Sequence, residues 1–394
     1  SPSPSPSLSI ISFLAGRRTA APAGFAAMKL PPAVACLLLL LVVFAAARVE
    51  ARGTPSSKRS KNQWSSMFVF GDDFVDNGNV PNNIGEKTSR QWSYPYGSYL
   101  NTHYATSPVL AGRFSNYRMQ SDFIARMLGL NEAPPAYELT SDQSSDSSGM
   151  TFAFGGAGVF KVKTKKVPTL AAQVQTFKRL VNDGVISTHQ LHHSVALIAI
   201  SGNDYMSDSD IETGFYTSFD DLDTYIGNVA TEILDNVAQL QMLGVRKVLV
   251  NNLHPIGCTP LHTSSNNYTT CDLLGNYGAS VHNKYLKQMI DERDNVHILD
   301  LYSAFTDIVN HAPGGGSDQS KDFDGKLTPC CESTDEGGFC GERSHSGKRL
   351  YDLCENPDKT FYWDQTHPTH AGWEAVMKAL QQPLTEFLDE DYIA

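Results

Sequence analysis

The tetrapeptide Asp364-Gln365-Thr366-His367 holds the residue types from which a proton-transfer pair can be built. A carboxylate three residues before a histidine in a tight loop can accept a hydrogen bond from imidazole Nδ1, which leaves Nε2 to face a substrate. A histidine held in this way can take up or release a proton at Nε2. The motif alone does not exclude an ordinary polar loop before a helix. We expect the neighbouring His370 in the first turn of that helix.

A second reactive candidate lies in a polar turn that follows the apolar run Met67–Phe70. A strand that ends in such a turn delivers its next side chains to the carboxyl edge of a sheet, where open α/β folds hold their sites. We expect Asp73 there, with Asp76 and Asn79 holding the turn together. A calcium loop is disfavoured, because Val75 would occupy a ligand position and no glutamate closes the loop. We therefore expect no metal.

Two further turns are rich in glycine and amide groups, Gly155-Gly156-Ala157-Gly158 and Ser201-Gly202-Asn203-Asp204. Ester hydrolysis needs a nucleophile, a base, an orienting acid and hydrogen-bond donors for the developing oxyanion. Each block lies just after an apolar stretch, where such groups could gather. A phosphate-binding loop is disfavoured because no Lys-Ser/Thr follows the glycines. As local patterns, both blocks are also ordinary turn signals.

Apolar runs that alternate with amphipathic stretches must position these turns. We expect strands at about 67–70, 150–154, 195–200, 247–251 and 296–301. We expect helices at about 119–128, 169–184, 219–243 and 278–293, and a last helix that begins near Thr369. This alternation predicts an α/β fold in which a five-stranded parallel sheet lies between two helical layers. The expected strand order is the flavodoxin-like 2-1-3-4-5.

Together these blocks resemble the plant GDSL esterase/lipases, a family of the SGNH hydrolase superfamily. The likeness spans about Met67 to Leu384 and includes Pro95-Tyr96-Gly97 and the segment 112–116. It implies a three-layer α/β/α SGNH fold, no cofactor, and an ester as substrate. It also implies a role for each of several residues: an orienting acid at Asp364, a base at His367, a backbone oxyanion donor at Gly156 and an amide oxyanion donor at Asn203.

One position departs from the family's pattern. The first block usually reads Phe-Gly-Asp-Ser with the serine as nucleophile, and Asp73 stands where that serine would be. No G-x-S-x-G motif elsewhere in the chain replaces it. A carboxylate is a weaker nucleophile toward esters and would form a reactive anhydride. It could also occupy the oxyanion site itself, or pair with a protonated His367.

The resemblance therefore implies a GDSL-type ester hydrolase of lipid, acylated carbohydrate or phenolic substrates that is impaired by Asp73. Two rescues stay open: Asp73 could act as a general base on water, or as a nucleophile toward substrates better suited to carboxylate attack. The alternative function is a catalytically inactive secreted family member that binds an acylated ligand or a cell-wall polymer. A purely structural extracellular role is a third hypothesis.

The N-terminal region predicts secretion. Met28-Lys29 precedes an apolar run from Ala33 to Ala47, and Val49-Glu50-Ala51 offers the small residues of a cleavage site. A transit peptide is the weaker alternative. We expect an extracellular protein of the apoplast or cell wall whose chain has four parts: upstream non-native sequence at 1–27, a secretory signal peptide at 28–51, a flexible lead-in at 52–65 and a single hydrolase domain at 66–394.

Cysteine usage agrees with secretion. Cys36 lies in the predicted signal peptide, and the other six cysteines form an even set that is typical of a disulfide framework rather than a zinc site. Cys258 and Cys271 flank a loop and are the pair we expect. The same loop holds the only glycosylation sequon, which begins at Asn267.

The formal net charge of −11 argues against nucleic acid or an anionic membrane as the main partner. Outside the predicted signal peptide, no apolar stretch approaches about 18 residues, so we expect no integral membrane span. The expected partner is a small-molecule or polymeric ester substrate. The sequence does not indicate the oligomeric state.

Overall fold

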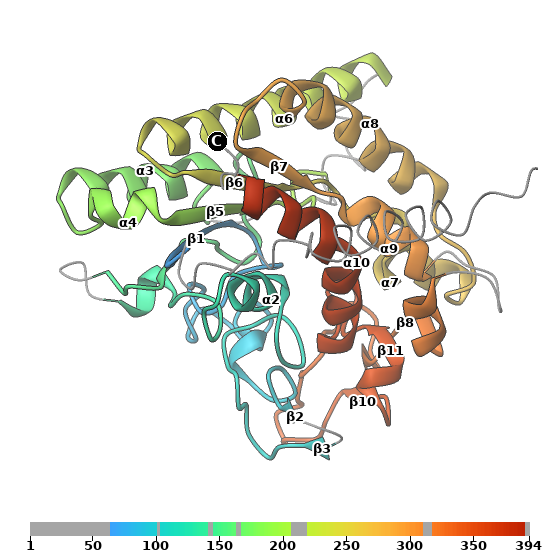
Figure 1. Ribbon diagram of the computed structural model, residues 1–394. Coiled ribbons are helices and arrows are strands. Elements are labelled where there is room, and N and C mark those ends of the chain that lie inside the picture. The colour runs from blue at the N-terminus through green and yellow to red at the C-terminus, as the bar shows by residue number, and fades with distance from the viewer. Residues whose placement is uncertain are drawn as a thin grey trace, which may run out of the picture. The chain divides into compact units, whose positions relative to one another are not determined.

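The centre of the computed structural model is a five-stranded parallel sheet. The structure describes residues 64–100, 103–140, 145–162, 167–205, 219–309 and 317–390. The strands of the sheet are β1 (Ser66–Gly71), β4 (Gly149–Thr151), β5 (Ser194–Ala199), β6 (Lys247–Asn251) and β7 (Val296–Leu299). Their order across the sheet is β4-β1-β5-β6-β7, which confirms the predicted 2-1-3-4-5 order (Figure 1).

The residues of β1 alternate between two hydrophobic cores. Met67 and Val69 pack into one core, whereas Phe68 and Phe70 pack into the other. All four side chains are fully buried. Because successive strand residues point to opposite faces, a run that is apolar at every position must be covered on both faces. Each such buried side chain contributes about 1.5–3 kcal/mol to folding.

Helices supply both covers, which confirms the three-layer α/β/α architecture (Figure 1). The core of Phe68 and Phe70 is closed by α3 (Leu170–Asn182), α4 (Thr188–His192), α6 (Phe219–Met242) and α8 (Leu273–Ile290). The core of Met67 and Val69 is closed by α2 (Gln120–Met127), α9 (Leu301–Val309) and α10 (His370–Asp389).

Side-chain caps set where several helices begin. Thr369 accepts a hydrogen bond from the backbone N of Gly372 at 2.9 Å, so α10 begins at His370, as predicted. Asp272 caps α8, which therefore begins at Leu273 and not near Gly278 as the sequence suggested. The prediction for strand five was also too long, because β7 ends at Leu299. The chain then forms α9, whose buried residues recur at helical spacing.

Shorter elements lie outside the central sheet and the helices that cover it. Two-stranded pairs form between β2 (Tyr99–Leu100) and β3 (His103–Tyr104), β8 (Gly325–Pro329) and β11 (Thr360–Tyr362), and β9 (Cys331–Ser333) and β10 (Tyr351–Leu353). Short helices are α7 (Pro260–Thr263), η1 (Arg90–Trp92), η2 (Tyr137–Leu139), η3 (Ile256–Cys258), η4 (Ser264–Asn266), η5 (Asp318–Asp322) and η6 (Pro357–Lys359).

Three disulfides join in pairs the six cysteines that lie outside the predicted signal peptide. The predicted pair Cys258–Cys271 is confirmed, and the others are Cys330–Cys354 and Cys331–Cys340. The predicted upstream sequence, the signal peptide and most of the lead-in lie outside the described residues. Within the described ranges, no helix is both long and apolar enough to cross a membrane.

Candidate active site

Gly71 ends β1 and turns the chain toward the candidate site. Its φ of 135° disfavours other residues, and a Cβ there would lie 1.9 Å from the carbonyl oxygen of Ala199 on β5. Gln173 of α3 holds the same peptide, because its Oε1 accepts from Gly71 N at 2.8 Å and its Nε2 donates to Gly71 O at 2.8 Å. The next two residues, Asp72 and Asp73, therefore lie at the carboxyl edge of the sheet.

Asp73 touches three of the other residues that the sequence singled out. Its Oδ1 accepts hydrogen bonds from the backbone N of Gly156 at 2.8 Å and from Asn203 Nδ2 at 3.0 Å. Its Oδ2 lies 2.7 Å from His367 Nε2. The side chain is 13% exposed, so this carboxyl group is largely enclosed and has both oxygens engaged.

Asp364 and His367 are buried neighbours in one tight loop. His367 Nδ1 lies 2.7 Å from Asp364 Oδ1 and 2.9 Å from Oδ2. Asp364 Oδ1 also accepts from the backbone N of Thr366 at 3.0 Å and of His367 at 2.9 Å. One imidazole nitrogen thus faces Asp364 and the other faces Asp73. All five residues predicted for the catalytic site and oxyanion hole are joined by hydrogen bonds in one place.

The surroundings of His367 favour its protonated form. Burial alone would lower the pKa of His367, but the charge of Asp364 and hydrogen bonds to Asp364 and Asp73 raise that pKa to about 9. Burial works against ionisation of Asp364 as well, yet His367 and Arg90 hold the pKa of this acid well below its usual range. At neutral pH, an imidazolium therefore lies between two carboxyl groups.

Asp72 is fully buried and fixes the amide of Asn203. Its Oδ2 accepts from the backbone N and the hydroxyl of Ser201, each at 2.7 Å, and from Asn203 Nδ2 at 3.2 Å. Burial and the charge of Asp73 raise the pKa of Asp72 to about 8, although the hydrogen bonds from Ser201 oppose the shift. Asn203 Nδ2 consequently lies between two carboxyl groups, which orients it toward Asp73.

Asp76 and Asn79 hold the turn after β1 together, as predicted. Asp76 Oδ1 accepts from the backbone N of Asn79 at 2.7 Å, and its Oδ2 accepts from the backbone N of Gly155 at 2.7 Å. Asn79 Nδ2 in turn donates to the carbonyl oxygen of Thr151 on β4 at 2.8 Å. The turn after β1 and the glycine-rich turn after β4 are therefore one unit, and this unit places Gly156 N at the site.

Asp204 holds the far end of the glycine-rich turn. Its two carboxylate oxygens accept from the backbone N of Val159 and of Phe160, each at 2.9 Å. A Cβ at Gly158 would lie 2.8 Å from Asp204 Oδ1, so this position has no room for a side chain. The sequence did not assign a role to Asp204 or Gln173, because their partners are distant in the chain.

Two other features lie apart from Asp73. His370 begins α10 and stacks on Phe123 with 5.3 Å between ring centroids. A cavity of about 730 Å³ is lined by residues that include His370 but not Asp73, so the volume does not mark the candidate site. Among the described residues, no group of three or more His, Cys, Asp or Glu side chains is arranged to hold a metal ion.

Comparison with known proteins places the chain in a family. The model of GDSL-like lipases and acylhydrolases matches residues 67–380. The chain belongs to this family. A GDSL esterase/lipase of Arabidopsis thaliana is 31% identical over 351 residues, which cover 86% of this chain and 93% of that protein. A second one from the same plant is 33% identical over 360 residues, with 88% and 95% covered.

Membership of this plant GDSL esterase/lipase family supports hydrolysis of ester bonds as the class of reaction. A solved lipase from a goat rumen metagenome aligns over 80% of this chain and 95% of its own, with 12% identity and a TM-score of 0.37.

Proposed function

We propose that this protein is a secreted GDSL-type ester hydrolase in which Asp73 occupies the position of the nucleophilic serine and suppresses turnover. Asp364 orients His367, His367 is the base, and Gly156 N and Asn203 Nδ2 are the oxyanion donors. The proposal is supported by family membership and by the hydrogen bonds that join these residues.

One observation carries the proposed impairment. The Asp73 carboxyl group already occupies the two proposed oxyanion donors and the base nitrogen, which ordinary catalysis needs for the substrate. Its Oδ1 accepts from both proposed oxyanion donors, and its Oδ2 lies 2.7 Å from the base nitrogen. An ester carbonyl would have to displace this oxygen to reach the same donors. The base is also protonated at neutral pH, since the pKa of His367 is about 9.

Two routes would still allow the wild-type chain to turn over. In the first, Asp73 takes a proton from water, the resulting hydroxide attacks the ester carbonyl, and the departing alkoxide takes a proton to leave as the alcohol. In the second, an Asp73 oxygen attacks the carbonyl and expels the alkoxide, which takes a proton from His367, and water then hydrolyses the anhydride that is left. Both require an Asp73 oxygen to leave its present hydrogen bonds, so we expect each to be slow.

A catalytically inactive binding protein is the second candidate. The enclosure of the Asp73 carboxyl group by neighbouring donors favours it, because a site filled by the protein's own anion can bind a neutral ligand at its rim without reacting. This role would take an acylated small molecule or a cell-wall polymer. It predicts saturable binding by the wild type without product formation.

Rates with short p-nitrophenyl esters separate these functions. The proposal expects a wild-type rate near background, a large gain on Asp73→Ser, and loss of that gain when His367→Ala is added. Wild-type turnover that disappears on His367→Ala would show that this site hydrolyses esters with aspartate at position 73, and would contradict the proposed suppression. A folded Asp73→Ser chain that stays inactive at every acyl length would refute the latent-hydrolase assignment.

A further inference from the structure

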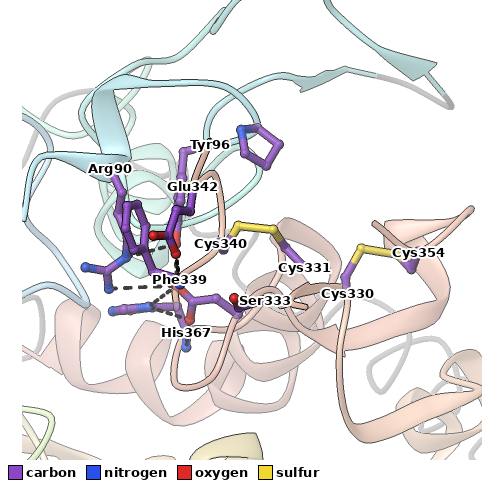
Figure 2. Close-up of a disulfide and its surroundings, with 12 residues drawn as sticks. Arg90, Tyr96, Cys330, Cys331, Ser333, Phe339, Cys340, Glu342, Cys354 and His367 are labelled. Atoms are coloured by element: carbon purple, nitrogen blue, oxygen red, sulfur yellow. Dashed lines mark hydrogen bonds and ion pairs between the residues drawn. A yellow bond between two sulfur atoms is a disulfide. The ribbon is translucent and has the colours of Figure 1, made fainter. Parts of the chain in front are cut away.

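Tyr96 is a fully buried tyrosine whose hydroxyl reaches the proposed orienting acid. The hydroxyl donates a hydrogen bond to Asp364 Oδ2 at 2.7 Å, across 268 residues of sequence. The ring packs edge-on against Trp363, with 6.0 Å between centroids. Figure 2 draws Arg90, Tyr96 and His367 together beside the Cys331–Cys340 disulfide, which belongs to the same buried cluster as Tyr96. The packing of its ring therefore fixes the Tyr96 hydroxyl next to Asp364.

Arg90 decides the direction of this hydrogen bond. Its Nε donates to the Tyr96 hydroxyl oxygen at 3.0 Å. Because a guanidinium group has only donors, the hydroxyl hydrogen is left for Asp364. Arg90 Nη2 also lies 3.9 Å from Asp364 Oδ2, which adds a positive charge beside the acid. On its other side, the guanidinium lies 5.1 Å from the ring centre of Phe114, and that ring stacks on His367.

The two oxygens of Asp364 are held by different groups. Backbone N–H groups of Thr366 and His367 hold Oδ1. Tyr96 and the charge of Arg90 hold Oδ2. We propose that Tyr96, assisted by Arg90, is a positioning residue that stops the Asp364 carboxylate from rotating away from the His367 imidazole. The two residues act through Asp364 and are not catalytic themselves.

The Tyr96→Phe variant tests this role because it removes only the hydroxyl. Tyr99→Phe is the matched control: Tyr99 is also buried, and its hydroxyl donates to a different acid, Asp358, at 3.2 Å. The primary readout is an NMR titration of His367 in the full chain with Asp73 intact. This readout does not depend on whether the protein hydrolyses anything.

We expect Tyr96→Phe to lower the pKa of His367 from about 9 by about one pH unit, because the acid is held less well against the ring. Tyr99→Phe should leave it unchanged. Arg90→Lys keeps the charge but lacks the planar fork of donors, so a smaller fall is expected. If Tyr96→Phe does not fold, the His367 titration of Arg90→Lys decides whether Asp364 is held in this way. An unchanged or higher His367 pKa in a folded Tyr96→Phe chain overturns the proposal, as does an equal fall in Tyr99→Phe.

A kinetic readout rests on the proposed function. In the Asp73→Ser background, Tyr96→Phe should lower kcat about tenfold and leave KM nearly unchanged, whereas Tyr99→Phe should change neither. A change confined to KM would contradict positioning. If Asp73→Ser has no activity, the proposed function fails, and the NMR titration still decides whether Tyr96 positions Asp364.

Discussion

Replacing Asp73 with serine should convert the site from a closed hydrogen-bonded cluster into a working one. The substitution frees Gly156 N and Asn203 Nδ2, which now bind Asp73 Oδ1 at 2.8 and 3.0 Å. It also removes one of the groups that raise the pKa of His367 to about 9. At that pKa only about 1% of the imidazole is neutral at pH 7, so even a modest fall would supply much more base.

The size of the gain follows from the geometry. Loss of a serine nucleophile costs about 10⁶ in kcat in a serine protease, which sets an upper limit on what the serine restores. A serine oxygen would lie near the present Asp73 carboxyl carbon, roughly 1.2 Å short of the oxygen that is now 2.7 Å from His367 Nε2. A misplacement of about 1 Å can cost about 10²-fold. We therefore expect Asp73→Ser to exceed the wild type by about 10⁴-fold.

The assay compares hydrolysis of p-nitrophenyl esters of increasing acyl length by the wild type and by Asp73→Ser, with labelling of position 73 by a fluorophosphonate as a second readout. Asp73→Asn is the control, because it matches the shape of aspartate but offers no nucleophile. Asp73→Ser/His367→Ala should lose the gain. The reasoning is refuted if folded Asp73→Ser shows wild-type rates and no labelling across the series, or if Asp73→Asn gains equally.

Two further predictions concern the scaffold and its modification. Gly71→Ala should lower the melting temperature by about 10 °C or more, because its Cβ would lie 1.9 Å from the Ala199 carbonyl oxygen. Gly129 has a φ of 89° but open space around it, so Gly129→Ala should lower the melting temperature much less. Equal losses in the two variants would contradict this prediction. Asn267 is exposed, so protein from a secretory host should carry one N-glycan that Asn267→Gln removes, and an unchanged mass would argue against the sequon's use.

The sheet could be predicted because each of its strands has a recognisable local sequence pattern. Between their end residues, β1, β5 and β6 are apolar at every position and are buried on both faces, which a short apolar run followed by a polar turn already indicates. The start of α8 could not be predicted in the same way. Its glycines suggest a break, whereas Gly275 lets the helix approach the chain at Gly257 closely, since a Cβ there would lie 3.0 Å from that backbone.

In the candidate site too, contacts between residues close in sequence could be predicted and contacts between distant residues could not. Asp364 and His367 are three residues apart, so their contact is encoded in the spacing itself. Tyr96 meets Asp364 across 268 residues, and Gln173 meets Gly71 across 102. No local pattern marks such partners, since a buried tyrosine or glutamine looks like any other core residue until the fold supplies its neighbour.

The charge state of His367 should make the stability of the protein depend on pH in a direction that tests the role of Asp73. The pKa of His367 is about 9 in the folded chain and near 6.5 in an unfolded one, so folding retains a proton. The resulting stabilisation, about 3 kcal/mol at most, is fully present below pH 6.5 and is lost as the pH rises through 9.

Asp73→Asn removes one source of the raised His367 pKa and should flatten this dependence of stability on pH. Free energies of unfolding from urea titrations between pH 6 and 10 should therefore differ most between the two chains at the acid end and converge at the alkaline end. Parallel curves would mean that the bond between Asp73 and His367 does not hold the proton.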